Sequence, residues 1–226
     1  MFIDRPDEDY VGLFGEVGQE GVTKNTGVVN ITVIGNDYVG GLVGHTEGSV
    51  SNSYSDGNVT GEEHVGSLVG HNGGMVSNSY SSGSVTGNSS VGGLVGDNWH
   101  YKGSVSNSYS TGNVIGGRRV GGLVGLNDYG SVTHSYSTGR VNGESDVGGL
   151  VGYNNGTVSN CLWDIQTSGQ VSSDGGTGKT TAQTKSIATF SGAAWNIIAV
   201  ASAGMRNPAY IWNIVDGVTY PFLSWQ

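Results

Sequence analysis

Histidine and acidic side chains recur at one position of this chain, directly after a Leu-Val-Gly block, and both are types of zinc ligand. Successive copies place His45, His71, Asp97, Leu126 and Tyr153 there. If the copies stack, the first three of these side chains fall in one line. A straight line of ligands fits a tetrahedral zinc site poorly, so the simpler interpretation of these positions is a row of solvated corner residues.

One loop is longer than its counterparts and carries three ring side chains. The segment 97–104 has 8 residues, whereas the segment 45–49 of an earlier copy has 5. The longer segment includes Trp99, His100 and Tyr101. Large rings on an exposed loop suit stacking on a sugar ring or anchoring a protein partner. The alternative is that these rings fold over their own coil.

Catalytic chemistry has little support in the sequence. A carbohydrate-active enzyme needs paired carboxylates, or a cluster of basic residues with a metal, on one face. The nearest candidates are Glu62, Glu63, Asp97 and His100. The sequence pattern does not bring an acid, a base and a nucleophile together. Acidic residues occur near turns, but the repeated nonapeptide of calcium-loaded solenoids is absent from the sequence. We therefore predict no enzyme activity and no cofactor.

Two further features have ordinary structural interpretations. Cys161 is the single cysteine and occupies a position that is serine in the other copies, which predicts an inert replacement. The segment 173–180 resembles a phosphate-binding loop, but Ser173 replaces its first glycine and no buried strand precedes it. We interpret that segment as a loop that leads into a helix.

The elements that would position these residues follow from a repeat. A Val-Gly-Gly-Leu-Val-Gly block recurs at intervals of 28, 26, 26, 29 and 27 residues, and a near-constant interval is typical of stacked repeats. The blocks start at Val11 (abbreviated), Val39, Val65, Val91, Val120 and Val147. Glycine in such density disfavours helices, so the repeats predict strands.

The strands predict a parallel β-solenoid of about six coils, ~30 Å long at the usual spacing between strands. Three apolar segments per repeat predict a triangular cross-section. Alternation in the segment 50–55 predicts that Val50, Asn52 and Tyr54 point to the same side. Equivalent asparagines are then expected to form an amide ladder at a corner, with the members Asn52, Asn78, Asn107 and Asn160.

The recurring Gly-Leu-Val-Gly and Asn-Ser-Tyr-Ser phrases resemble the GLUG repeat of bacterial and archaeal surface and secreted proteins. The resemblance covers residues 11–163, and Ser67 departs from it by replacing a glycine. The tail is also similar to the segment that commonly follows such repeats. The resemblance implies an extracellular repeat region of an adhesin-like protein, and it implies no catalytic residue.

The chain divides into a solenoid, residues 1–163, and a C-terminal cap, residues 164–226. The cap is expected to cover the open end of the solenoid. Within it we predict a short helix over Thr180–Thr189 and two strands, Ile211–Val215 and Val218–Leu223, around an Asp-Gly turn.

The composition of the chain argues against nucleic-acid binding and against a membrane span. The net charge of −9 and the pI near 4.7 argue against nucleic-acid binding. The sequence has no run of 18 apolar residues, so we predict no membrane span. The segment 2–6 reads as a strand end without a polar cap, which predicts a fragment of a longer secreted chain and end-to-end association through the N-terminal coil.

Together these features predict a non-catalytic module of a secreted or cell-surface protein. It would act as a structural spacer or as an adhesive surface, with a glycan or an extracellular protein as partner. One alternative is a carbohydrate-binding or carbohydrate-active β-helix. Another is an ice- or surface-binding solenoid, although its flat outward ladders would be threonine and here they are mostly serine.

Overall fold

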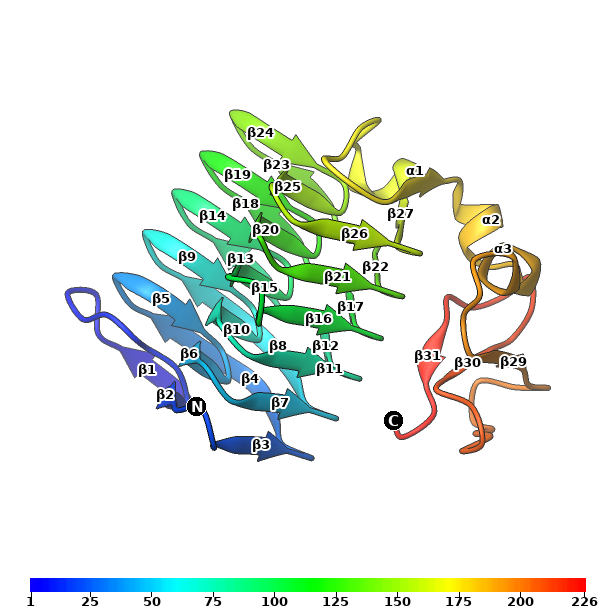
Figure 1. Cartoon of the computed structure of the whole chain (residues 1–226), viewed down its shortest axis with the longest axis horizontal. Helices are drawn as coiled ribbons and strands as arrows, with labels where there is room; N and C mark the ends of the chain where they lie inside the picture. The colour runs from blue at the N-terminus through cyan, green and yellow to red at the C-terminus, as the bar shows by residue number, and fades with distance from the viewer.

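The computed structural model describes residues 1–226, and its main body is a parallel β-solenoid of about six coils (Figure 1). Strands of successive coils pair in parallel and in register, so that Val65 lies between Val39 and Val91. The predicted all-β solenoid is confirmed.

Each coil passes through four sheets, so the predicted triangular cross-section is wrong. The Val-Gly-Gly-Leu-Val-Gly block forms two strands with a turn between them rather than a single segment: one strand ends at Gly66 and the next begins at Val69. The first strand of each block belongs to sheet 1 and the second to sheet 2. The strands of sheet 1 are β5 (Asp37–Gly40), β9 (Glu63–Gly66), β14 (Ser89–Gly92), β19 (Arg118–Gly121) and β24 (Ser145–Gly148).

Sheets 2 and 3 each have six strands. Sheet 2 comprises β2 (Phe14–Val17), β6 (Val43–Thr46), β10 (Val69–Asn72), β15 (Val95–Trp99), β20 (Val124–Asp128) and β25 (Val151–Asn154). Sheet 3 comprises β3 (Val22–Lys24), β7 (Ser49–Ser51), β11 (Met75–Ser77), β16 (Ser104–Ser106), β21 (Ser131–Thr133) and β26 (Thr157–Ser159).

Sheet 4 closes the coil with 11 strands. They are β1 (Phe2–Asp4), β4 (Gly27–Ile34), β8 (Tyr54–Thr60), β12 (Tyr80–Ser81), β13 (Ser84–Thr86), β17 (Tyr109–Ser110), β18 (Val114–Ile115), β22 (Tyr136–Ser137), β23 (Val141–Asn142), β27 (Leu162–Asp164) and β28 (Thr177–Lys179).

Valine and leucine ladders fill the interior of the stack. The leucine of every full block is completely buried, and these leucines belong to a core of 28 residues. The glycine that ends each sheet 1 strand is required by close packing: a Cβ on Gly92 would overlap the carbonyl oxygen of Val95 and lie 2.7 Å from the backbone nitrogen of Gly125 in the next coil. The motif thus lets the chain turn tightly against its neighbouring coil.

The corner between sheets 3 and 4 overturns two predictions. Asn52 has φ +48°, a left-handed conformation that asparagine tolerates, and this corner breaks the alternation of the strand. Val50 and Ser53 are buried while the ring of Tyr54 points outward. The predicted ladder through Asn52, Asn78, Asn107 and Asn160 is therefore absent. Of its members, only Asn52 donates to the asparagine of the coil before, with its Nδ2 3.3 Å from Asn25 Oδ1.

An amide ladder does occur, at the end of sheet 2. Asn72 donates to Asn98 (2.8 Å), Asn98 to Asn127 (2.7 Å) and Asn127 to Asn154 (2.7 Å), each from Nδ2 to Oδ1. The first three asparagines are completely buried. The ladder joins four coils below the surface that carries the loop with Trp99.

Two parts of the C-terminal region cover two surfaces of the solenoid. Residues 170–179 lie over the last coil: Ser173 Oγ accepts from the backbone nitrogens of Leu150 and Val151, and β28 pairs with β27. The remainder runs back along the side of the stack, where β29 (Ile197–Ala199), β30 (Trp212–Ile214) and β31 (Phe222–Leu223) form a small sheet (Figure 1).

The helices of this region are short. They are α1 (Ile165–Ser168), α2 (Thr181–Thr184) and α3 (Ile187–Gly192). The single predicted helix over Thr180–Thr189 is in fact two helices, because Ser186 is extended and Ile187 donates its backbone N–H to Asp216 Oδ1 (2.8 Å). Thr180 is the N-cap of α2, as predicted. None of the helices is long and apolar enough to cross a membrane.

The returning segment covers a ladder of stacked tyrosines on the outside of sheet 4. Tyr54, Tyr80, Tyr109 and Tyr136 stack with ring centroids 5.0–5.1 Å apart. Tyr136 Oη donates to the carbonyl of Pro221 (2.6 Å), and Tyr109 Oη accepts from Gln226 (2.6 Å). A second core of eight residues forms between this ladder and the segment.

The N-terminal end remains an open edge. β2 pairs only with β6 and β3 only with β7. Leu13, Phe14 and Val22 are exposed there. End-to-end association through this edge stays a prediction.

Candidate functional site

The loop that follows β15 presents the aromatic side chains singled out in the sequence. Trp99 is 43% exposed and Tyr101 is 77% exposed, while the ring of His100 lies between theirs, with ring centroids 5.1 Å and 3.6 Å away. The indole of Trp99 lies over the preceding coil, where its centroid is 5.6 Å from that of His71. Trp99 therefore packs partly on the coil and still leaves ring surface open to solvent.

Backbone contacts hold this loop in place. His100 donates its backbone N–H to the carbonyl of Asp128 (2.7 Å), and Gly103 donates to the carbonyl of His100 (2.9 Å). Trp99 also forms an antiparallel bridge with Tyr129 of the next coil. The rings are thus fixed on the solenoid before any ligand arrives, which lowers the entropic cost of binding.

Tyr129 adds a third large exposed aromatic side chain to the same corner. It is 63% exposed and adopts φ +63°. Sequence reasoning missed it, although the signal was available: the segment 126–131 has one residue more than the segment 45–49. We call Trp99, His100, Tyr101 and Tyr129 the aromatic corner.

Beneath the aromatic corner lies a cluster of His45, His64, His71 and Asp97, which we call the histidine cluster. His64 Nδ1 is 3.2 Å and His71 Nε2 is 3.5 Å from Asp97 Oδ2. His45 stacks on His71 with centroids 5.0 Å apart and turns its Nδ1 toward Glu16 Oε1, 3.6 Å away. Asp97 is only 3% exposed, and its Oδ1 has no hydrogen-bond partner.

Burial shifts the protonation equilibria of this cluster. Loss of water lowers the pKa of His71 to about 3, and the nearby His45 and His64 act in the same direction. Burial raises the pKa of Asp97, while the adjacent His64 opposes that effect. The imidazole of His71 is therefore neutral at physiological pH and offers an uncharged ring beneath Trp99.

The predicted column of His45, His71 and Asp97 does align in register. His71 and Asp97 come within reach of each other, but His45 turns away to Glu16. No group of three or more histidine, cysteine, aspartate or glutamate side chains has an arrangement that could hold a metal ion.

The sequence reading missed His64 because it belongs to a different column. Tyr10, Tyr38, His64, Ser90 and Arg119 each precede the first valine of a block or of its abbreviated copy, and all have φ between +53° and +58°. The rings of the first three stack with centroids 4.9 Å apart. The left-handed corner swings His64 toward Asp97 of the next coil. No spacing rule in the sequence signals that contact.

Cys161 and the candidate catalytic carboxylates either lie apart from the aromatic corner or contact another side chain. Cys161 is buried, and burial raises the pKa of its thiol to about 12. Its Sγ is 3.2 Å from the carbonyl of Ser159. Glu62 and Glu63 are exposed at a turn, whereas Asp97 is buried against His64. No pair of carboxylates faces an open cleft there.

Comparisons with known proteins show which family the repeats match. Residues 35–60, 61–86, 87–115 and 116–142 each match the family model of the GLUG motif. Over 59 residues the chain is 41% identical to halomucin of Haloquadratum walsbyi, a stretch that takes in 26% of this chain and 1% of halomucin. The chain therefore spans a very small part of that relative.

A solved structure has a similar fold along most of the chain. It is a "putative immunoglobulin A1 protease" from Bacteroides ovatus, with a TM-score of 0.64 over 93% of this chain and 70% of that one, at 19% identity. At that identity the likeness concerns the fold alone. The four tandem family matches coincide with coils whose strands pair in register, and residues 35–142 are therefore four GLUG-motif repeats.

Proposed function

We propose that this chain is a non-catalytic module of a secreted or cell-surface protein, and that its aromatic corner binds a glycan. The observation that carries the proposal is the set of three exposed aromatic rings held at one corner of an otherwise regular stack. Aromatic faces suit the apolar face of a sugar ring, and their hydroxyl and N–H groups suit its polar edge.

The groups directly beneath Trp99 favour the stacking of a neutral sugar ring, whereas Lys102 of the same loop and Asp128 beside Tyr129 place charges at the rim. His71 beneath Trp99 is uncharged at physiological pH, because burial lowers its pKa to about 3. The buried Asp97 carboxylate is 3.2 Å from His64 and faces away from solvent. Binding would therefore depend on ring stacking, with hydrogen bonds from side chains at the rim.

A secreted or surface location is part of the proposal. It is supported by the GLUG-motif repeats and by the local similarity to halomucin. The low proportion of charged residues, 12%, fits a stack whose order comes from ladders between coils.

The non-catalytic part of the proposal is supported by the state of the candidate groups. The thiol of Cys161 stays protonated because its pKa is raised to about 12. Asp97 is buried against two imidazoles, and Glu62 and Glu63 are exposed at a turn. A glycosidase would need two carboxyl groups facing one substrate. At 19% identity the structural neighbour supports the fold alone, and its name is no support for an activity of this chain.

The ice-binding alternative has less support. On sheet 3 the outward ladders contain mainly serine, interrupted by Val22, Lys24, Met75, Thr133 and Thr157. Serine hydroxyls lack the methyl groups that a regular threonine array would present.

An array of glycans and extracellular-matrix proteins tests the proposed function. The wild-type protein is compared with Trp99→Ala and with Tyr153→Ala, which removes an exposed tyrosine of sheet 2 outside the aromatic corner. We expect saturable binding to a glycan that is lost in Trp99→Ala and kept in Tyr153→Ala. Absence of wild-type binding, or equal binding by both variants, would refute the proposal.

A further inference from the structure

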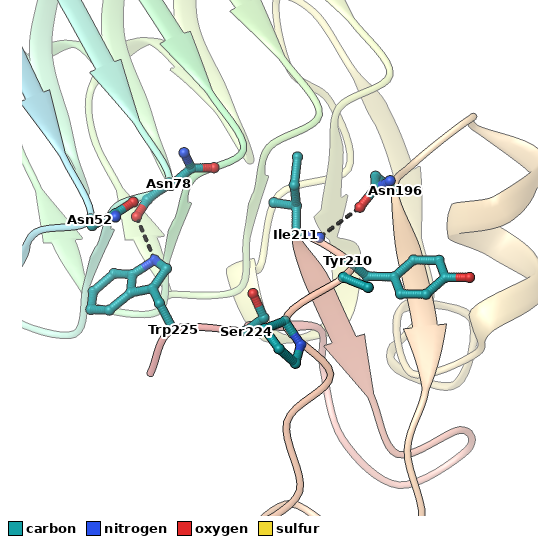
Figure 2. Close-up of a pocket in the computed structure, with 9 residues that line it drawn as sticks. Asn52, Asn78, Asn196, Tyr210, Ile211, Ser224 and Trp225 are labelled. Atoms are coloured by element: carbon teal, nitrogen blue, oxygen red, sulfur yellow. Dashed lines mark hydrogen bonds between the residues drawn. The ribbon is translucent and has the colours of Figure 1, made fainter.

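A groove separates the solenoid from the C-terminal segment at the corner between sheets 3 and 4 (Figure 2). Its volume is about 500 Å³, within the range of sites that take small ligands. The solenoid contributes Asn52 and Asn78 to its wall, and the C-terminal segment contributes Asn196, Tyr210, Ser224 and Trp225. This groove lies at a different corner of the coil from the aromatic corner, with the width of sheet 3 between them.

The lining of the groove contains no charged side chain, although the protein has a net charge of −9. Three asparagines and a serine supply polar groups, and the remaining lining residues are aromatic or apolar. A second groove, over sheet 3, is different because it includes Glu20, Glu47 and Lys102. The uncharged lining favours a neutral ligand that is rich in hydroxyl groups.

Two asparagines of the solenoid, Asn52 and Asn78, line this groove. Asn78 Oδ1 is buried and has no hydrogen-bond partner. Asn52 Nδ2 reaches only the exposed Asn25, at 3.3 Å. An asparagine amide offers both a donor and an acceptor, which match the vicinal hydroxyls of a sugar.

Trp225 is held in a fixed orientation beside these amides. Its Nε1 donates to the backbone carbonyl of Asn78 (2.9 Å), as Figure 2 shows. Its ring also lies near the tyrosine ladder, 5.8 Å from Tyr80 and 6.5 Å from Tyr54 between centroids. The indole is therefore preorganised, and it supplies an apolar surface next to two amides.

We propose that this groove is a binding site for a neutral oligosaccharide. Sugar hydroxyls would pair with the amides of Asn52 and Asn78, and the apolar face of a sugar ring would lie against Trp225. The site does not depend on the aromatic corner, so the two proposals fail or succeed separately.

The test is an NMR titration of the full chain with neutral hexasaccharides of glucose, mannose, xylose and N-acetylglucosamine. An oligogalacturonate of equal length serves as the charged comparator. We expect at least one neutral hexasaccharide to shift the side-chain amide signals of Asn52 and Asn78 and the indole N–H signal of Trp225 in a saturable way. The same shifts are expected in Trp99→Ala, which separates this site from the aromatic corner.

A matched pair of variants locates the site. Asn52→Asp keeps the shape and the left-handed conformation but removes the amide donor and adds a charge, and it should weaken binding about tenfold. Asn107→Asp makes the same change in the same column, with φ +49°, outside the groove, and should bind like the wild type. The proposal is overturned if no neutral hexasaccharide shifts the three signals, if the oligogalacturonate binds equally well, or if the two variants bind alike.

Discussion

His71 shows how a single side chain on a solenoid surface can differ from an ordinary exposed residue. Its usual pKa is 6.5, and burial together with His45 and His64 lowers it to about 3. In the unfolded chain the imidazole takes up a proton below pH 6.5, whereas the folded protein keeps it neutral down to about pH 3. Stability must therefore fall as the pH drops through this window.

We predict that the wild type loses about 1 kcal/mol of stability between pH 6.5 and 5.5 through this residue. In His71→Gln that loss should disappear, so the two pH profiles should converge as the pH falls. The measurement is the urea-unfolding midpoint of both proteins at each pH. The pKa of Asp97 is raised, so the contribution of this residue makes the folded protein more stable as the pH falls. This opposite contribution is present in both the wild type and His71→Gln. Parallel profiles would show that His71 titrates normally.

Single residues also mark where sequence reasoning reached its limit. The aromatic loop was predictable from its extra length, and its exposed rings follow from that length. His64 was not predictable in this way, because its contact depends on a corner with positive φ. The asparagines of the true amide ladder have no positive φ, and each stands two residues after a Leu-Val-Gly block, so their column was visible in the sequence. A left-handed residue such as Asn52 reverses which side chains point inward. Strict alternation therefore gives the wrong face beyond it.

At the scale of the elements, the amide ladder is a chain of buried side-chain hydrogen bonds that joins four coils. Asn98 occupies its centre, donating to Asn127 and accepting from Asn72. Asn154 lies at the end, where it accepts from Asn127 and is only partly buried. The cost of removing a member should therefore depend on its place in the ladder.

We predict that Asn98→Ala lowers the free energy of unfolding by about 3 kcal/mol, because it leaves the buried Asn127 Oδ1 without a donor and leaves Asn72 Nδ2 with only the carbonyl of Ser104 as acceptor (3.2 Å). Asn154→Ala should cost about 1 kcal/mol, since Asn127 Nδ2 still donates to the carbonyl of Gly130 (3.2 Å). Urea unfolding of the two variants measures the difference. Equal costs would contradict the ladder as a cooperative element.

The glycine that ends each sheet 1 strand is a second element-scale feature. Gly92→Ala should destabilise the protein by about 3 kcal/mol, because its Cβ would overlap backbone atoms of its own coil and of the next one. Gly192→Ala is the control, since a Cβ there meets nothing within 4 Å, and its effect should stay within about 0.5 kcal/mol. Thermal unfolding of both variants tests this, and a tolerated Gly92→Ala would disprove the packing argument.

On the scale of the whole molecule, the repeats and their register were predictable because they require only a constant interval and ladders of apolar residues. The path of the C-terminal segment was not. The C-terminal region was predicted to cover the open end, but the outward tyrosine ladder of sheet 4 provides an apolar surface along the side, on which Trp195 and Trp212 pack. Only residues 170–179 cover the last coil.

This arrangement gives the solenoid two different long faces. The tyrosine ladder is covered by the chain's own C-terminal segment, whereas the aromatic corner remains open. A rigid stack with one uncovered set of rings fits a module that presents a binding surface at a fixed place. The proposed function therefore requires that this corner carries affinity for a glycan of its own.

The most direct measurement is isothermal titration of the array's best glycan into the wild type, Trp99→Ala and Tyr153→Ala, with their thermal unfolding as a check of folding. The account predicts at least a tenfold loss of affinity in Trp99→Ala and unchanged affinity in Tyr153→Ala, with all three proteins folded. Wild-type affinity in a folded Trp99→Ala would contradict it.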